Sequence, residues 1–224
     1  MKRTKLADRV LPTYTKGEEV FNMVSHIVGA VLGIVAIVLC SIFAAKHGNA
    51  YGVVSGVIFG VTLLVLYTMS SIYHGLSSKL PAKKVFQIID HCSIFILIAG
   101  TYTPFCLCSL REQNPQVGWT IFGIIWGLAI LGTTLNSIDL KKYKVFSMIC
   151  YLIMGWFIVF KMPLLVEKIR INGFMLLVAG GICYTIGAIL YGIGKKRKWM
   201  HSIFHLTCLA GSLFHFFCIL FYVI

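Results

Sequence analysis

A long uncharged stretch, VFNMVSHIVGAVLGIVAIVLCSIFAA, occupies residues 20–45 between Glu19 and Lys46. A helix that crosses the hydrocarbon core of a membrane needs roughly 20 mainly apolar residues. This stretch is long enough to cross, and it exceeds the roughly 7 to 15 apolar residues at the centre of a cleavable secretory signal. It therefore predicts a membrane-spanning helix that remains in the mature protein.

Similar stretches follow along the whole chain, in which 58% of the residues are hydrophobic and only 12% are charged. The fifth is short, and it spans a membrane only if Lys161 snorkels or faces the bundle while the helix continues toward Val166. The pattern predicts an all-α polytopic membrane protein, a seven-transmembrane helix bundle formed by residues 20–224, with residues 1–19 as a short basic tail. The stretches occupy residues 20–45, 50–73, 92–110, 117–138, 145–160, 173–194 and 200–224.

Lysine and arginine are distributed unevenly between the segments that join these stretches. Most of the 20 Lys and Arg residues lie in the N-terminal tail and in the second, fourth and sixth loops, the last of which contains KKRK (residues 195–198). Cytoplasmic loops carry an excess of positive charge, so we expect a cytoplasmic N-terminus and place Ile224 outside the cell. The same distribution accounts for the net charge of +13 without a nucleic-acid partner.

Glycine, proline and cysteine residues in these stretches have structural interpretations. Pro104 and Pro163 are expected to kink or end helices. The eight cysteines lack CxxC spacing and are interpreted as packing residues rather than disulfides or ligands. Small residues at helix-packing spacing predict close contact between helices. They are Gly29 and Gly33, then Gly52, Gly56 and Gly60, then Gly123 and Gly127.

Polar residues near the cytoplasmic ends of three stretches indicate a metal site. His74 ends the second stretch in MSSIYHG, Asp90 begins the third, and His201 and His205 begin the seventh in HSIFH. The predicted topology brings all four to the same leaflet. Residues four apart share a helix face, so His201 and His205 can both direct their rings into the bundle, and Ser70 has the same relation to His74.

Asp90 stands apart from the other acidic residues because it lies inside the beginning of a helix, where a charged side chain is costly. It could instead cap that helix or pair with Lys83 or Lys84. The remaining acidic residues fall in the tail, at helix ends or in loops. They are Asp8, Glu18, Glu19, Glu112, Asp139 and Glu167.

Three imidazoles with a carboxylate nearby suit a Zn²⁺ ion of the catalytic kind, which takes three protein ligands and keeps a fourth position open. We predict that His74, His201 and His205 are the metal ligands. Asp90 would hold the metal-bound water or act as the general base, and Ser70 would support the ligands or stabilise charge on the substrate.

Other roles for the histidines stay open at this point. Interfacial histidines also contact lipid headgroups or serve a structural purpose. Two further histidines, His26 and His215, lack a ligand-type residue four positions away, and we interpret them as interhelical hydrogen-bonding residues.

The chain resembles the hemolysin III-type membrane proteins, the bacterial branch of the progestin and adipoQ receptor family, which is itself similar to the alkaline ceramidases. The resemblance covers nearly the whole chain and rests on EEVFNMVSH, SSIYH, DHCSIFILIAGTYTPF, YLIMGW, GGICYTIGAILY and HSIFHLTCLAGSLFHF. It implies a seven-helix bundle with a zinc site on the cytoplasmic side. In that site His74, His201 and His205 would bind the ion, Asp90 would contact the zinc-bound water, and Ser70 would be the serine of SxxxH.

Several activities occur among these relatives. Animal members act as receptors for hormones or adipokines, the ceramidases hydrolyse a lipid amide, and bacterial members are named for cell lysis. Our leading hypothesis is a zinc-dependent hydrolase of a lipid amide or ester, located in the cell membrane with membrane lipids as partners. The alternative is a membrane-active cytolysin, or a regulator of membrane lipid or energy state, in which zinc is structural.

Overall fold

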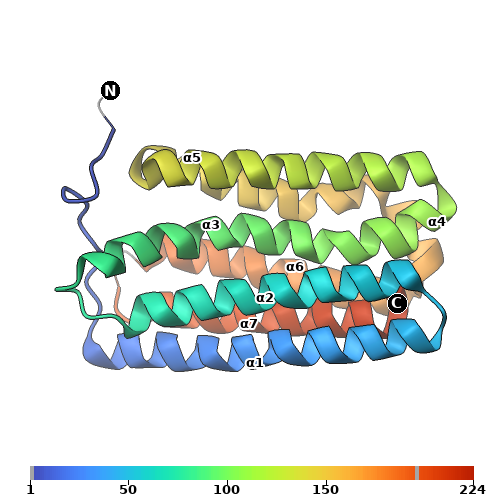
Figure 1. Cartoon of the computed structure of the whole chain (residues 1–224), viewed down its shortest axis with the longest axis horizontal. Helices are drawn as coiled ribbons and strands as arrows, with labels where there is room; N and C mark the ends of the chain where they lie inside the picture. The colour runs from blue at the N-terminus through green and yellow to red at the C-terminus, as the bar shows by residue number, and fades with distance from the viewer. Residues whose placement is uncertain (1–2, 195–196) are drawn as a thin grey trace.

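The computed structural model describes residues 3–194 and 197–224, and this part of the chain forms helices without a β-strand. Lys2, Lys195 and Lys196, which belong to the predicted basic tail and sixth loop, lie outside the described residues. The long helices lie side by side along the longest axis, with the two chain termini toward opposite ends (Figure 1). In chain order the elements are α1 (Lys16–Lys46), α2 (Ala50–Gly75), α3 (Pro81–Pro104), π-helical η1 (Phe105–Leu110), α4 (Arg111–Gln113), α5 (Pro115–Trp156), 3₁₀-helical η2 (Phe157–Lys161), α6 (Met162–Ile193), α7 (Met200–Cys218) and π-helical η3 (Ile219–Val223).

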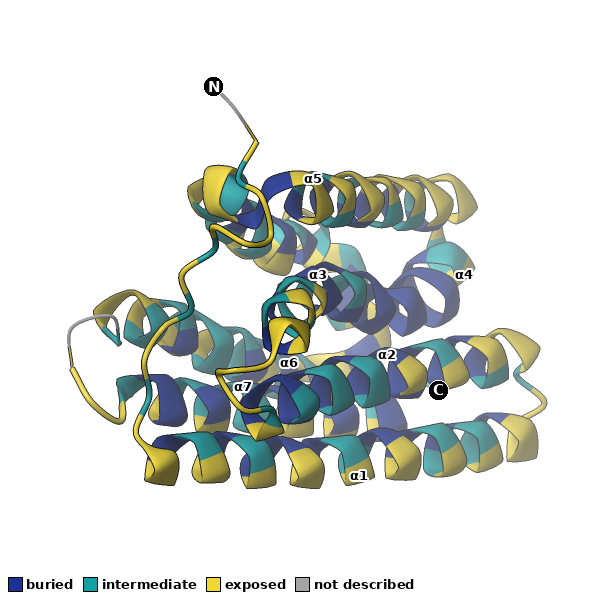
Figure 2. Ribbon diagram, turned by 60° about the vertical axis from the view of Figure 1, so that its left-hand side comes forward, coloured by how far each residue is buried: buried dark blue, intermediate teal, exposed yellow. Residues whose placement is uncertain are grey.

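The outer surface of the bundle is apolar. On α1, Val28, Val31 and Ile34 are each more than half exposed, at 55%, 54% and 52%. Helix α3 is the central helix (Figure 2): in the continuous stretch Pro81–Gln113, which it begins, 83% of the most apolar window is buried, against 28% for α1. Apolar patches of this extent are rare on soluble monomers, and they match the hydrocarbon solvent of a membrane.

Among the described residues, five helical stretches are long and apolar enough to cross a membrane, in place of the seven that we predicted. The difference lies in the fourth, Pro115–Ile193, which has 79 residues. A straight helix of that length would measure roughly 120 Å, about four times the thickness of the hydrocarbon core. Its backbone leaves the helical conformation at Asp139 (φ −157°, ψ 90°) and at Arg170 (φ 58°, ψ 171°). The stretch is therefore divided by two breaks.

The break at Asp139 has a local cause. Its Oδ1 accepts hydrogen bonds from the backbone N–H groups of Lys141 and Lys142, both at 3.1 Å, in the manner of a helix N-cap. Its Oδ2 accepts a hydrogen bond from the N–H of Thr4 at 2.8 Å. A new helical segment thus begins after Asp139, at the end of the bundle where the N-terminal segment lies.

The break at Arg170 lies at the opposite end. Gln113, just before α5, donates a hydrogen bond to the carbonyl of Leu164 at 2.8 Å, and Lys168 forms an ion pair with Glu112. The chain therefore turns back near Asp139 and again near Arg170.

Close helix contact at glycine is confirmed for α1 and α2 but not for α5. A Cβ on Gly33 would lie 2.6 Å from the backbone nitrogen of Leu64, and one on Gly60 would lie 2.6 Å from that of Ile37. A Cβ on Gly123 or Gly127 would instead point into open space and meet no atom of the described chain within 4 Å, so their predicted packing role is wrong.

The prediction that prolines kink or end helices holds for Pro104, after which α3 gives way to the π-helical η1, but not for Pro163, which begins a helix. Pro104 is the last residue of α3, and Pro163 lies in the first turn of α6, where the missing N–H is tolerated. All eight cysteines are free.

Candidate metal centre

His74 lies in the last turn of α2, with a buried ring whose two nitrogens have different surroundings. Nδ1 lies 2.6 Å from Oε2 of Glu19 in the first turn of α1. Nε2 is buried and has no hydrogen-bond partner in the described chain. Because a carboxylate accepts a hydrogen bond from Nδ1–H, the neutral ring presents a lone pair at Nε2. That nitrogen is suited to bind a metal ion.

His201 and His205 lie one turn apart at the beginning of α7, both buried. Their Nε2 atoms are 3.0 Å apart, so both rings direct the same nitrogen to one point. The prediction that the i, i+4 spacing would turn both rings into the bundle is confirmed.

The structure brings His74, His201 and His205 together from α2 and α7. One ligand nitrogen from each lies within 4.8 Å of the others, so the group could hold a metal ion. Imidazole-rich sites suit Zn²⁺ and other transition metals. Three converging buried imidazoles, with an orphaned nitrogen on His74, fit such an ion better than they fit a purely structural cluster.

Two further aromatic rings enclose the cluster. Tyr14, in the segment before α1, stacks on His201 with ring centroids 4.8 Å apart and planes at 19°. Burial raises the pKa of the Tyr14 hydroxyl, so this residue stays neutral. His26 of α1 stacks on His205 at 3.8 Å. The predicted interhelical hydrogen bond of His26 is not formed within the described chain, whereas Nε2 of His215 does contact the Leu177 carbonyl at 3.1 Å.

A cavity of about 190 Å³ opens beside the cluster. His201, His205, Ser70 and Asp90 all line it. Ser70 is buried one turn before His74, and the Asp90 side chain is 17% exposed. Asp90 makes no hydrogen bond to a cluster histidine in the described chain, and its carboxylate lies 3.6 Å from Nδ1 of the neighbouring His91. The carboxylate therefore lines the cavity, and the group that could hold a metal ion consists of three imidazoles.

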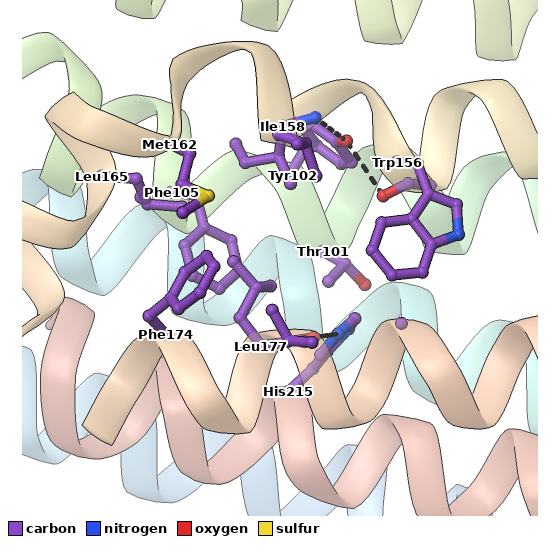
Figure 3. Close-up of a pocket in the computed structure, with 14 residues that line it drawn as sticks. Thr101, Tyr102, Phe105, Trp156, Ile158, Met162, Leu165, Phe174, Leu177 and His215 are labelled. Atoms are coloured by element: carbon purple, nitrogen blue, oxygen red, sulfur yellow. Dashed lines mark hydrogen bonds between the residues drawn. The ribbon is translucent and has the colours of Figure 1, made fainter. Parts of the chain in front are cut away.

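A second, apolar chamber lies next to this cavity, toward the other end of the bundle (Figure 3). This second chamber, of about 40 Å³, shares Thr101, Tyr102 and His215 with the first and extends to Phe105 and Leu165. Figure 3 shows these side chains converging on one space. The two chambers are thus neighbours with mainly apolar walls, and the larger one borders the histidine cluster.

Sequence reasoning missed the partner of His74. From the sequence we assigned Glu19 to the acidic residues in the tail, at helix ends or in loops, and we considered Lys83 or Lys84 as a partner of Asp90. In the structure Lys83 pairs with Glu19 at 2.7 Å, and Nζ of Lys84 donates to the Ala7 carbonyl at 2.6 Å. The position of Glu19 in EEVFNMVSH was the available signal, but nothing local linked it to His74.

Comparison with known proteins shows the family to which the chain belongs. Residues 14–216 match the sequence model of a family described as Haemolysin-III related. The chain is 42% identical over 207 residues to Hemolysin-3 of Bacillus cereus, covering 92% of each protein. It is 41% identical over 211 residues to the Hemolysin-3 homolog of Bacillus subtilis (strain 168), covering 94% of this chain and 97% of that protein.

A more distant similarity reaches into animals. The chain is 27% identical over 210 residues to the human Monocyte to macrophage differentiation factor, covering 90% of this chain and 83% of that protein. The range of the family match includes every residue of the histidine cluster and its neighbours described above.

Proposed function

Because the chain belongs to the Haemolysin-III related family of multi-pass membrane proteins, we propose that it is a membrane-embedded, zinc-dependent hydrolase of a lipid amide or ester. The observation that carries the proposal is the convergence of His74, His201 and His205 beside a cavity lined by Asp90 and Ser70. Three protein ligands with an open fourth position are typical of catalytic zinc. When bound, the ion would supply a Lewis acid and lower the pKa of water toward neutrality.

The protein residues have separate roles in this reaction. Hydrolysis breaks the bond between the carbonyl carbon and the amide nitrogen or ester oxygen, and adds hydroxyl to the carbon and a proton to the leaving group. Asp90 accepts the proton from the attacking water and delivers it to the leaving amine or alcohol. Ser70 donates a hydrogen bond to the carbonyl oxygen as negative charge develops there. The larger cavity, whose walls include Ile94, Leu97 and Ile98, accommodates the acyl chain next to the cluster.

The test separates metal binding from turnover. Purified protein is incubated with a membrane lipid extract, and the fatty acid released and the bound zinc are both measured. Asp90→Ala should keep the metal and lose turnover, whereas His205→Ala should lose both. Unchanged turnover in Asp90→Ala would remove Asp90 from the mechanism, and no release by the parent protein from any lipid would exclude the hydrolase.

The orientation in the membrane belongs to the same proposal. We infer that Pro115–Ile193 crosses three times, divided at Asp139 and Arg170, so that the chain has seven spans. The basic tail of residues 1–19 and the metal centre then lie on the cytoplasmic side. Reporter fusions after Lys142 should report cytoplasm, and those after Arg170 or Ile224 should report the outside. A cytoplasmic signal after Arg170 would contradict the seven-span arrangement.

A cytolysin is the second candidate, favoured by the name of the 42% identical relative, Hemolysin-3. In this case zinc would be structural and lysis would not need Asp90. Red-cell lysis by the purified protein that persists in Asp90→Ala would support the cytolysin, while loss of lysis together with turnover would assign both to one catalytic centre.

A further inference from the structure

The carboxylate of Glu19 lies between two buried groups from different helices. Oε2 is 2.6 Å from Nδ1 of His74 at the end of α2, and Oε1 is 2.7 Å from Nζ of Lys83 at the start of α3. The side chains of His74 and Lys83 are 0% and 2% exposed, against 20% for Glu19. Each carboxylate oxygen of Glu19 therefore has its own partner, one on α2 and one on α3.

The Lys83 ammonium has two contacts besides Glu19. Its Nζ donates a second hydrogen bond to the Leu76 carbonyl at 2.8 Å and lies 5.2 Å from the centre of the Tyr73 ring. A buried ammonium is costly unless it is paired and hydrogen-bonded. Glu19 supplies the ion pair that the buried Lys83 ammonium needs, and Lys83 in turn holds the carboxylate oxygen that does not contact His74.

This arrangement determines which nitrogen of His74 faces the cluster. A carboxylate accepts a hydrogen bond from Nδ1–H, and the tautomer that places the proton there leaves Nε2 as an acceptor. Carboxylates behind metal-binding histidines orient the ring and raise its basicity, and their loss typically costs roughly 10–100-fold in metal affinity. Nε2 of His74 is the nitrogen without a partner in the described chain.

We propose that Glu19, held in place by Lys83, is a positioning residue of the metal centre, which fixes His74 as the Nδ1–H tautomer with Nε2 toward the ion. The inference rests on the metal-binding part of the proposed function. If Glu19 only tied α1, α2 and α3 together, its loss would lower the stability of the metal-free protein and leave metal affinity unchanged. The proposed role predicts instead that its loss weakens metal binding, whatever the stability of the metal-free protein.

The first experiment titrates the purified full-length protein in detergent with Co²⁺, followed by visible absorption, and measures zinc affinity by competition with a chelator. Glu19→Gln keeps the size of the side chain but removes the charge, and it should weaken binding of both ions roughly 10- to 100-fold. Glu112→Gln is the matched control, because Glu112 also pairs with a lysine, Lys168, at the other end of the bundle. This control should bind both ions like the parent protein.

A double-mutant cycle tests the part played by Lys83. Lys83→Met should weaken metal binding less than Glu19→Gln, since the His74 contact remains. In the Glu19→Gln background Lys83→Met should have no further effect on metal affinity. Full additivity of the two losses would overturn the claim that Lys83 acts through Glu19.

The outcomes distinguish this inference from the proposed function. Parent protein that binds neither Co²⁺ nor zinc contradicts the metal centre itself. Parent protein that binds metal, with Glu19→Gln binding it equally well, overturns only the role of Glu19. A fall in the unfolding temperature of metal-free Glu19→Gln without loss of affinity would likewise show a structural tie alone.

A second measurement needs no variant of Glu19, so it does not depend on whether such a variant folds. Nitrogen-15 NMR of histidine-labelled, metal-free parent protein should show a neutral His74 protonated at Nδ1, identified by the signals missing in His74→Ala. Protonation at Nε2 would overturn the inference.

Discussion

The imidazole of His26 stacks on that of His205, with ring centroids 3.8 Å apart and planes at 29°. Neither ring nitrogen of His26 has a hydrogen-bond partner in the described chain, and the Tyr67 ring meets it edge-on at 4.8 Å. His26 is therefore held by ring contacts. It packs on a histidine of the candidate metal centre from α1, which contributes no residue to the group of three histidines.

This packing predicts opposite results for two substitutions of His26. His26→Phe keeps a flat ring and removes two unpaired buried nitrogens, so metal binding should persist and the unfolding temperature should not fall. His26→Ala leaves a cavity and frees the His205 ring, and it should destabilise the protein by about 2–4 kcal/mol and weaken zinc binding. Thermal unfolding and zinc competition measure both. Loss of metal from His26→Phe would show that a ring nitrogen, rather than stacking, is needed.

Removal of one cluster ligand should abolish stoichiometric metal binding. His74→Ala and His205→Ala each leave two imidazoles, and we expect less than about half an equivalent of zinc after gentle extraction, because structural and catalytic zinc sites use at least three protein ligands. His91→Ala is the matched control: His91 lines the same cavity, but its Nδ1 contacts the Gln87 carbonyl at 2.9 Å. Elemental analysis of the three purified variants decides the question, and equal metal content in all three would exclude the cluster.

The ring of Tyr14 should slow the escape of the metal. It stacks on His201 from the segment before α1, so Tyr14→Ala uncovers that ligand and should speed the transfer of bound Co²⁺ to a chelator several-fold. Burial raises the pKa of this hydroxyl, so Tyr14→Phe removes no charge at neutral pH and should exchange metal at the parent rate. Stopped-flow absorption records the transfer, and identical rates for Tyr14→Ala and Tyr14→Phe would mean that the ring does not cover the site.

Two glycines at helix-packing spacing should respond differently to the same substitution. Gly33→Ala places a methyl group 2.6 Å from the Leu64 backbone nitrogen, so α1 and α2 must separate, at a cost of about 1–3 kcal/mol. Gly123→Ala points into open space and should be neutral, or stabilising by up to about 1 kcal/mol through helix propensity. Unfolding in detergent by a chemical denaturant compares the two, and equal losses would refute the contact between α1 and α2.

The helical spans show which part of the fold could be predicted from sequence patterns. Hydropathy identified the membrane class and every apolar segment, but it gave no reason to join the segments between Pro115 and Ile193. The cap at Asp139 depends on Lys141 and Lys142 nearby and on Thr4 far away in the chain. The contacts of Asp139 with Lys141 and Lys142 are local and could be predicted from the sequence, whereas its contact with Thr4 could not.

The cluster shows the same limit at the level of side chains. His201 and His205 share a face because helix geometry is periodic, and the spacing of SxxxH placed Ser70 with His74 for the same reason. Glu19 and His74 are 55 positions apart, and Lys83 reaches Glu19 from a third helix. Hydropathy and helical spacing are local properties, which the order of residues fixes. The contacts of His26 with His205 and of Glu19 with His74 depend on how distant helices approach one another, and that approach is set by the packing of the whole bundle.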